Sequence, residues 1–217
     1  MGLRRFALFL LVFLTFSTLS PAQKADVSFV VGGAFASDAK VPSGIVCITA
    51  PCPTTFNIST KNHVFYEGTG AIRLANFKLA SLHLEVPIAG VPSSGLRFSG
   101  SGANTNATSD TVSSLFVTPS LRVKLAPGFP ISPFASIGGG WARYNINGNT
   151  TSNKGALQFG GGVDIKTGIP LLGFRAEVRD FVSDQPFAFF TAVTTSQSPI
   201  DGRRHNVLAG GGIVLRF

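Results

Sequence analysis

Three polar side chains of the types that hydrolases use stand at alternate positions of one short segment. Ser81, His83 and Glu85 lie two residues apart within ASLHLEVPI. A serine within hydrogen-bond reach of a histidine, which an acid in turn orients, forms a nucleophilic site. Residues two apart along a strand are separated by roughly 6.5–7 Å, whereas a nucleophile and its base need about 3 Å. We therefore interpret the three as polar residues of a protein interior and predict no enzymatic activity.

A larger set of charged residues also alternates with apolar ones. In the segment GFRAEVRDF (173–181), Arg175, Glu177 and Arg179 share one parity. Buried charges are costly unless they are paired, and both signs are present, so we predict one paired interior network. An ion or proton path is the functional alternative. The predicted members of the network are Glu67, Arg73, Glu85, Arg122, Asp164, Arg175, Glu177 and Arg179.

The two cysteines are close together in the segment IVCITAPCP. A zinc site usually needs four ligands, and His63, His83 and His205 lie far from these cysteines in sequence. If the chain is exported, as its amino-terminal residues described below predict, a local disulfide between Cys47 and Cys52 is the better interpretation, because the compartment is oxidising. We predict neither a metal site nor a cofactor.

Three Gly-Gly-Gly runs, at 138–140, 160–162 and 210–212, could suggest phosphate loops. A phosphate loop must open onto the amino terminus of a helix, and the sequence predicts no helix after any of the three. Glycine inside strands marks curvature or a close approach of backbones. We interpret all three runs as structural.

The amino-terminal residues have the pattern of a secretory signal peptide. Arg4 and Arg5 precede an apolar run at 6–14, and Ser20-Pro21-Ala22 supplies small residues for cleavage. The run is shorter than the roughly 20 residues that a spanning helix needs. We predict a signal peptide over 1–22 and a single exported domain over 23–217.

The composition favours a membrane protein without a helical anchor. The chain is 44% hydrophobic with 20 Phe, only 13% of its residues are charged, and no later apolar stretch is long enough for a spanning helix. The net charge is +8, but the basic residues are scattered, which argues against nucleic-acid binding. A basic surface is compatible with the phosphates of a lipopolysaccharide layer.

Eight segments alternate apolar and polar residues with the period of a strand. They span 26–36, 64–75, 80–88, 114–125, 134–145, 156–167, 173–184 and 207–217. In the fifth of them, Trp141 and Tyr144 are predicted to mark a membrane interface. In the last, Val207, Ile213 and Phe217 belong to one apolar face.

The links between the segments alternate in length. Short links are predicted at 76–79, 126–130 and 168–172, and long polar links at 37–62, 89–113, 146–155 and 185–205. Short periplasmic turns and long surface loops are typical of outer-membrane barrels. The prediction is an all-β protein, an eight-stranded antiparallel up-and-down transmembrane β-barrel. Side chains just fill a barrel of this size, which argues against an open pore.

Three segments carry a resemblance to a known family: GFRAEVRDF (173–181), PFASIGGG beginning at Pro133, and the terminal GGGIVLRF. Together they resemble the small OmpA/OmpX-like proteins that have an outer membrane protein beta-barrel domain, over 24–217. The resemblance implies a non-enzymatic barrel in the cell outer membrane that displays four surface loops. It also implies lipopolysaccharide, outer-membrane lipid and the barrel-assembly machinery as partners, and the last strand, with Leu215 and Phe217, resembles the assembly signal.

Within this reading the expected roles are envelope integrity, adhesion or shielding. Three alternatives remain open. A lipid-modifying enzyme of the outer membrane would depend on His83. A narrow channel would conduct ions across a bilayer. A soluble lipocalin-like binding barrel would dissolve without detergent.

Overall fold

The computed structural model describes residues 25–37, 39–42, 55–60, 62–100, 109–146, 150–169, 171–184, 188–190, 197–199 and 203–217. Within these ranges the secondary structure is β-strand, and no helix is long and apolar enough to cross a membrane. The predicted signal peptide, Cys47 and Cys52 lie outside the described residues, so these predictions stay predictions.

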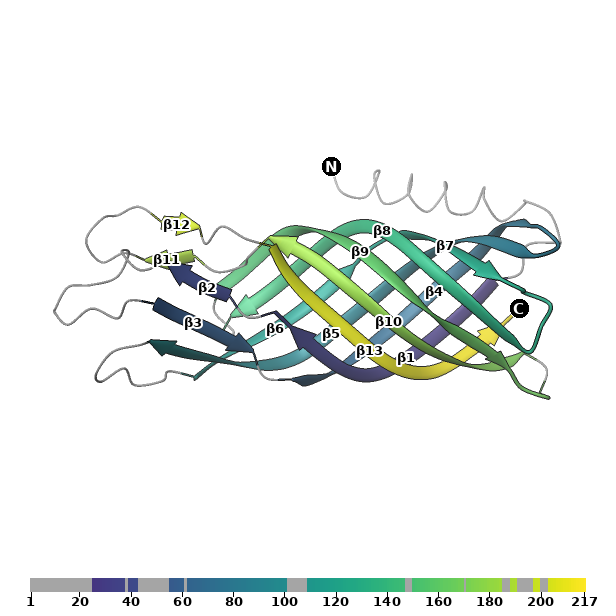
Figure 1. Ribbon diagram of the computed structural model, residues 1–217, viewed down its shortest axis with the longest axis horizontal. Coiled ribbons are helices and arrows are strands. Elements are labelled where there is room, and N and C mark those ends of the chain that lie inside the picture. Colours follow the sequence, from purple (N-terminus) through teal and green to yellow (C-terminus); the bar gives the residue numbers. More distant parts are fainter. Residues whose placement is uncertain are drawn as a thin grey trace, which may run out of the picture.

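The barrel wall consists of eight antiparallel strands that tilt steeply around a long axis (Figure 1). In chain order they are β1 (Ala25–Ala36), β4 (His63–Asn76), β5 (Ala80–Gly100), β6 (Ser109–Val117) continued by β7 (Ser120–Leu125), β8 (Ile131–Ile146), β9 (Thr150–Lys166), β10 (Leu172–Asp184) and β13 (Arg203–Arg216).

Each wall strand pairs with its neighbour in sequence, and the first pairs with the last. Val31 of β1 stands opposite Gly211 of β13 on one side and opposite Tyr66 of β4 on the other. At the end of the seam, the amide of Phe217 donates a 2.8 Å hydrogen bond to the carbonyl of Ala25. The sheet is therefore closed, which confirms the predicted eight-stranded up-and-down barrel.

β6 and β7 form one wall strand with a short interruption. The predicted strand 114–125 is broken at Thr118 and Pro119, because proline has no amide hydrogen to donate to the ladder. The register continues across the break, since Val117 and Ser120 keep one register with β5 and one with β8; the irregularity in the β5–β6 pairing lies elsewhere, between Val91 and Ser94. The strand therefore works as a single wall element.

The alternation of side chains is the reverse of that in a soluble protein. On β1, Val27 and Phe29 are 50% and 49% exposed on the outer wall, while Asp26 and Ser28 are 5% and 2% exposed in the lumen. The other wall strands repeat this pattern, so apolar side chains surround the barrel. An apolar surface of this extent is unstable in water and is covered by acyl chains in a bilayer.

The short links lie where they were predicted, but two long links are shorter than expected. β5 continues to Gly100 and β6 begins at Ser109, so most of 89–113 is strand. β8 ends at Ile146 and β9 begins at Thr150. These strand ends lack a sustained apolar period, although their backbones are paired, with one irregularity between Val91 and Ser94 of β5.

Four short strands lie at the end of the barrel where the long links are (Figure 1). β2 (Ala39–Pro42) pairs with β3 (Thr55–Thr60), and β3 pairs with the end of β5. β11 (Ala188–Phe190) pairs with β12 (Gln197–Pro199) as a separate ribbon.

The first and last glycine of each run face the lumen, where atoms of the neighbouring strands come close. A Cβ on Gly212 would overlap the backbone of Phe29 on β1, and one on Gly162 would overlap that of Ala176 on β10. A larger residue at either position would push the paired strands apart. The glycine runs thus permit the tight wall, as expected for a small barrel.

Candidate functional site in the barrel lumen

The lumen has two regions of different chemistry. On β10 the inward residues Arg175, Glu177 and Arg179 are followed by Phe181 as the strand runs from the short-turn end toward the long-link end. β1 and β4 make the same change, from Ser28 to Val30 on β1 and from Glu67 to Phe65 on β4. We call the charged region the charge network and the apolar region the apolar plug.

The centre of the charge network is one arginine among three glutamates. Arg179 lies 3.0 Å from Glu67, 2.8 Å from Glu85 and 3.0 Å from Glu177. All four side chains are almost fully buried and come from β4, β5 and β10. Ser120 also donates a 3.0 Å hydrogen bond to Glu85. The arginine thus joins three strands across the lumen.

A second arginine extends the network toward the short-turn end. Arg122 of β7 donates two hydrogen bonds, of 2.9 and 2.7 Å, to the carboxylate of Asp26 on β1. Its other terminal nitrogen lies 3.2 Å from Glu85. Both hydrogen bonds come from Nη2 and reach the two oxygens of the carboxylate, and because charged hydrogen bonds are the strong ones, this pair fixes β1 against β7 across the lumen.

The third group of ion pairs surrounds Asp164 of β9. Arg175 donates two hydrogen bonds to this carboxylate, of 2.8 and 3.2 Å, and Lys124 donates one of 2.5 Å. Arg175 also donates to Ser28 at 3.0 Å, and its guanidinium lies 4.8 Å from the centre of the Phe134 ring. The ring covers a cation that is already paired.

The structure brings seven of the eight residues of the predicted network into these contacts. The eighth, Arg73, is half-buried near the end of β4 and lines the cavity described below. Sequence reasoning did not include Asp26 and Lys124 among the members. Their inward position could have been found from the alternation of residues along the strand. Asp26 stands among alternating apolar residues at the start of β1, and Lys124 lies two residues after Arg122, on the same face of β7.

The apolar plug is built around three aromatic rings. Phe116 and Phe181 stack with ring centres 4.7 Å apart, and Tyr144 meets Phe116 edge-on at 5.9 Å. The Tyr144 hydroxyl lies 2.7 Å from that of Ser183 and accepts a 3.2 Å hydrogen bond from Asn206. The plug is completed by Val30, Ala34, Phe65, Ala89, Val91, Val112, Ala142, Ala156 and Leu208.

The interpretation of Tyr144 as a membrane-interface residue is wrong. Its side chain is 1% exposed and faces the lumen, whereas Trp141 is 37% exposed on the outer wall. Residues three apart on a strand point to opposite faces, so both could not face lipid.

The three residues with hydrolase chemistry separate into two groups. Ser81 Oγ and His83 Nε2 lie 2.9 Å apart, so the spacing argument against contact is wrong for this pair. Glu85 belongs to the charge network instead. The acid beside the histidine is Asp26, whose Oδ2 lies 3.8 Å from Nδ1. That carboxylate is already bound by Arg122.

A cavity of about 370 Å³ opens at the short-turn end of the barrel. Its polar lining residues are Asp26, Arg73, Ser81, His83, Lys124, Lys166, Thr167 and Arg216. Among the described ranges of the chain, no group of three or more His, Cys, Asp or Glu side chains could hold a metal ion.

No family model matches the chain, and no curated protein matches it in sequence. Among solved structures, it is similar to the outer membrane protein OprG from Pseudomonas aeruginosa, with a TM-score of 0.53 and 9% identity over 90% of this chain and 96% of that one. Neisserial surface protein A gives a TM-score of 0.48 and 13% identity over 89% and 97%. The fold is that of the small outer-membrane β-barrel proteins.

The lipid-facing wall and this fold together place the barrel in an outer membrane. In such barrels the short turns face the periplasm and the long loops face outward. The cavity opens at the short-turn end, which this orientation would make the periplasmic mouth, and the apolar plug lies toward the long-link end. The charge network separates the two.

Proposed function

We propose that this chain is a non-enzymatic outer-membrane barrel that displays four surface loops and serves envelope integrity, adhesion or shielding. The observation that carries the proposal is the filled lumen. Ion pairs of Arg122 and Arg179 cross it in one layer, and the stacked Phe116 and Phe181 rings fill it in another. Because the charge network and the apolar plug both fill the lumen, other molecules can reach the barrel only at its two ends and its outer wall.

The same observation argues against the narrow-channel alternative. A conducting path needs continuous polar surface, whereas the plug is apolar and its rings are in contact. Opening it would require ring displacement, which costs the packing energy of a buried aromatic cluster.

The surface-display role draws support from the strands beyond the wall. β3 pairs with the end of β5 through Phe56 to Thr60, so the first loop continues the sheet outward. β11 and β12 form a second ribbon at this end (Figure 1). A paired ribbon holds a loop in a defined shape, which suits recognition of a partner.

We further propose lipopolysaccharide, outer-membrane lipid and the barrel-assembly machinery as partners. Arg143 and Arg203 are exposed on the outer wall near the surface end, where lipid phosphates lie. Leu215 and Phe217 are exposed at the periplasmic end of the last strand, as an assembly signal would need to be. The Phe217→Ser variant is expected to reach the membrane at a lower level than an exposed-loop variant.

Conductance measurements test the closed lumen directly. The purified barrel is expected to give no single-channel current in planar bilayers. A variant with Phe116→Ala and Phe181→Ala removes two rings of the plug and is the comparison in which current could appear. Phe159→Ala on the outer wall is the matched control. Steady channels from the unmodified protein would overturn the proposal. Antibody binding to an epitope inserted within 185–205, on intact cells, tests display.

The contact between Ser81 and His83 favours one second candidate, hydrolysis of an ester at the periplasmic mouth. Ser81 Oγ would attack the ester carbonyl while its proton passes to His83 Nε2, 2.9 Å away. The ester C–O bond then breaks, the imidazolium returns the proton to the leaving alcohol, and water hydrolyses the acyl-serine with the histidine as base. Against it, Asp26 is held by Arg122 and lies 3.8 Å from the histidine. Labelling by a fluorophosphonate probe, lost in Ser81→Ala, would establish this activity; an unlabelled barrel would exclude a reactive serine.

A further inference from the structure

The periplasmic cavity carries an excess of positive charge. Four basic side chains line it, Arg73, Lys124, Lys166 and Arg216, and one acidic side chain of its described lining, that of Asp26, opposes them. Asp164 lies behind Lys124, 2.5 Å away, and is shared with Arg175. Like charges brought together in a region of low dielectric repel one another strongly, so an anion that enters is stabilised.

Two side chains of the lining present nitrogen atoms that lack a hydrogen-bond acceptor. The Nε and Nη2 atoms of Arg216 are buried without a hydrogen-bond partner among the described residues, and Asp164 lies 3.8 Å from Nη2. The same holds for Nδ1 of His83, a side chain that is only 6% exposed. A buried donor that makes no hydrogen bond is unfavourable. An oxyanion in the cavity would accept from these groups.

The rim of the same cavity is apolar. Ile169, Leu171 and Phe217 line it and are about 60% exposed, at 61%, 59% and 61%. Pro127 and Leu172 lie beside them. The cavity thus has a cationic floor within the barrel and an apolar edge where the barrel meets the inner leaflet. A free inorganic anion would use the floor alone.

We propose that the periplasmic mouth binds an anionic amphiphile, whose phosphate or carboxylate head group enters the cavity and whose acyl chain lies along the apolar rim. The head group contacts Arg216, Lys124 and His83. This ligand site is independent of the surface loops and goes beyond the proposed display function. The leaflet that supplies the ligand follows from the proposed orientation, whereas binding to the purified barrel does not depend on it.

The experiment is a titration of the refolded full-length barrel in dodecyl maltoside micelles, followed by native mass spectrometry. The probes are dodecyl phosphate, inorganic phosphate and dodecanol, which have the head group and chain, the head group alone, and the chain alone. We expect dodecyl phosphate to form a saturable 1:1 adduct. Inorganic phosphate should bind more weakly, and dodecanol should not bind. If inorganic phosphate binds as tightly as dodecyl phosphate, the acyl chain adds nothing and the site is one for a soluble anion, which overturns the proposal. Dodecanol that binds as tightly would overturn the anion site.

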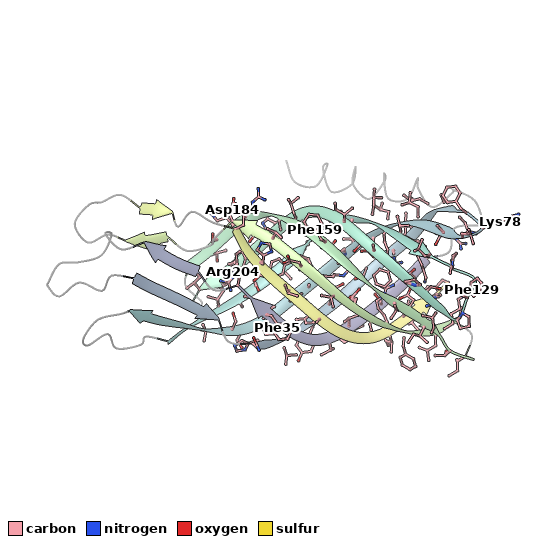
Figure 2. The ribbon with its side chains drawn as sticks, in the orientation of Figure 1. Phe35, Lys78, Phe129, Phe159, Asp184 and Arg204 are labelled. Atoms are coloured by element: carbon pink, nitrogen blue, oxygen red, sulfur yellow. The ribbon has the colours of Figure 1, made fainter. Side chains whose placement is uncertain are left out.

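Charge-removing variants locate the site. Arg216→Gln is expected to weaken dodecyl phosphate binding about tenfold, the value of one charged hydrogen bond. Lys78→Gln is the matched control, because Lys78 is exposed at the same end of the barrel but does not line the cavity (Figure 2). Since Arg216 lies within the predicted assembly signal, Arg73→Gln provides a second variant outside it. Equal affinity of both lining variants and the control would overturn the proposal.

Discussion

The two halves of this lumen are filled by opposite means between the same walls. The charge network holds strands together through groups that each depend on a particular partner, as Arg179 does on three glutamates. The apolar plug holds them through contacts that many side chains share, as Phe116 does with Phe181 and Tyr144. The difference teaches that damage should be unequal: loss of one charge leaves its partners uncompensated, while loss of one ring leaves a space that its neighbours partly fill.

The largest effect is expected from Arg179→Met. The substitution keeps much of the side-chain volume but leaves Glu67, Glu85 and Glu177 close together without their shared cation. Breaking a buried ion pair costs about 3–5 kcal/mol, so we expect a loss of about 5 kcal/mol in the free energy of unfolding. Urea unfolding of the barrel in lipid vesicles measures it.

The control removes the stranded carboxylates as well. Adding Glu67→Gln and Glu177→Gln to Arg179→Met leaves Glu85, which keeps Arg122 at 3.2 Å and Ser120 at 3.0 Å. About half of the lost stability is expected to return, because the uncompensated charge and not the missing volume is the cause. A combined variant no more stable than Arg179→Met would show that the arginine acts through packing.

A smaller loss is expected when the plug loses one ring. Phe181→Ala removes the stacking partner of Phe116 and leaves a cavity, at about 3 kcal/mol, while Phe181→Leu keeps most of the volume and costs about 1 kcal/mol. The same urea titration compares the two. If both variants lose as much as Arg179→Met, the contrast between the two halves does not hold.

Much of the barrel was predictable because lipid on one side and a narrow lumen on the other impose a strict period of two. Segments such as 173–184 were therefore found to within a residue of β10. The failures came where lipid no longer acts. β5 continues to Gly100, and its serine- and glycine-rich end (SSGLRFSG, 93–100) has no sustained apolar period to read.

The candidate site was predictable only in part, for a related reason. Parity indicates which residues face the lumen, and so the inward positions of Arg122 and Arg175 could be read from the sequence. Partners across the lumen depend on how the strands are staggered when the sheet closes. The contact between Arg122 and Asp26, 96 residues away, has no local signal. The lean of Ser81 toward His83 is likewise set by packing.

The smallest loss of stability is expected from Tyr144→Phe, and it tests whether this side chain faces the lumen or the lipid. The change removes the hydroxyl that contacts Ser183 and Asn206 but keeps the ring against Phe116. Asn206 retains the Phe181 carbonyl at 3.3 Å and Ser183 the Asp184 carbonyl at 3.2 Å, so about 1 kcal/mol or less should be lost.

Because Tyr144 faces the lumen, this loss should be the same in vesicles of short-chain and long-chain lipids. Trp141→Phe is the matched comparison on the outer wall, where an indole at the interface responds to bilayer thickness. A lipid-dependent loss in Tyr144→Phe equal to that in Trp141→Phe would return the tyrosine to the interface and remove it from the plug. A loss that does not depend on the lipid would show that the long-link end of the lumen is stabilised by packing of its own side chains, in contrast to the ion pairs of the charge network.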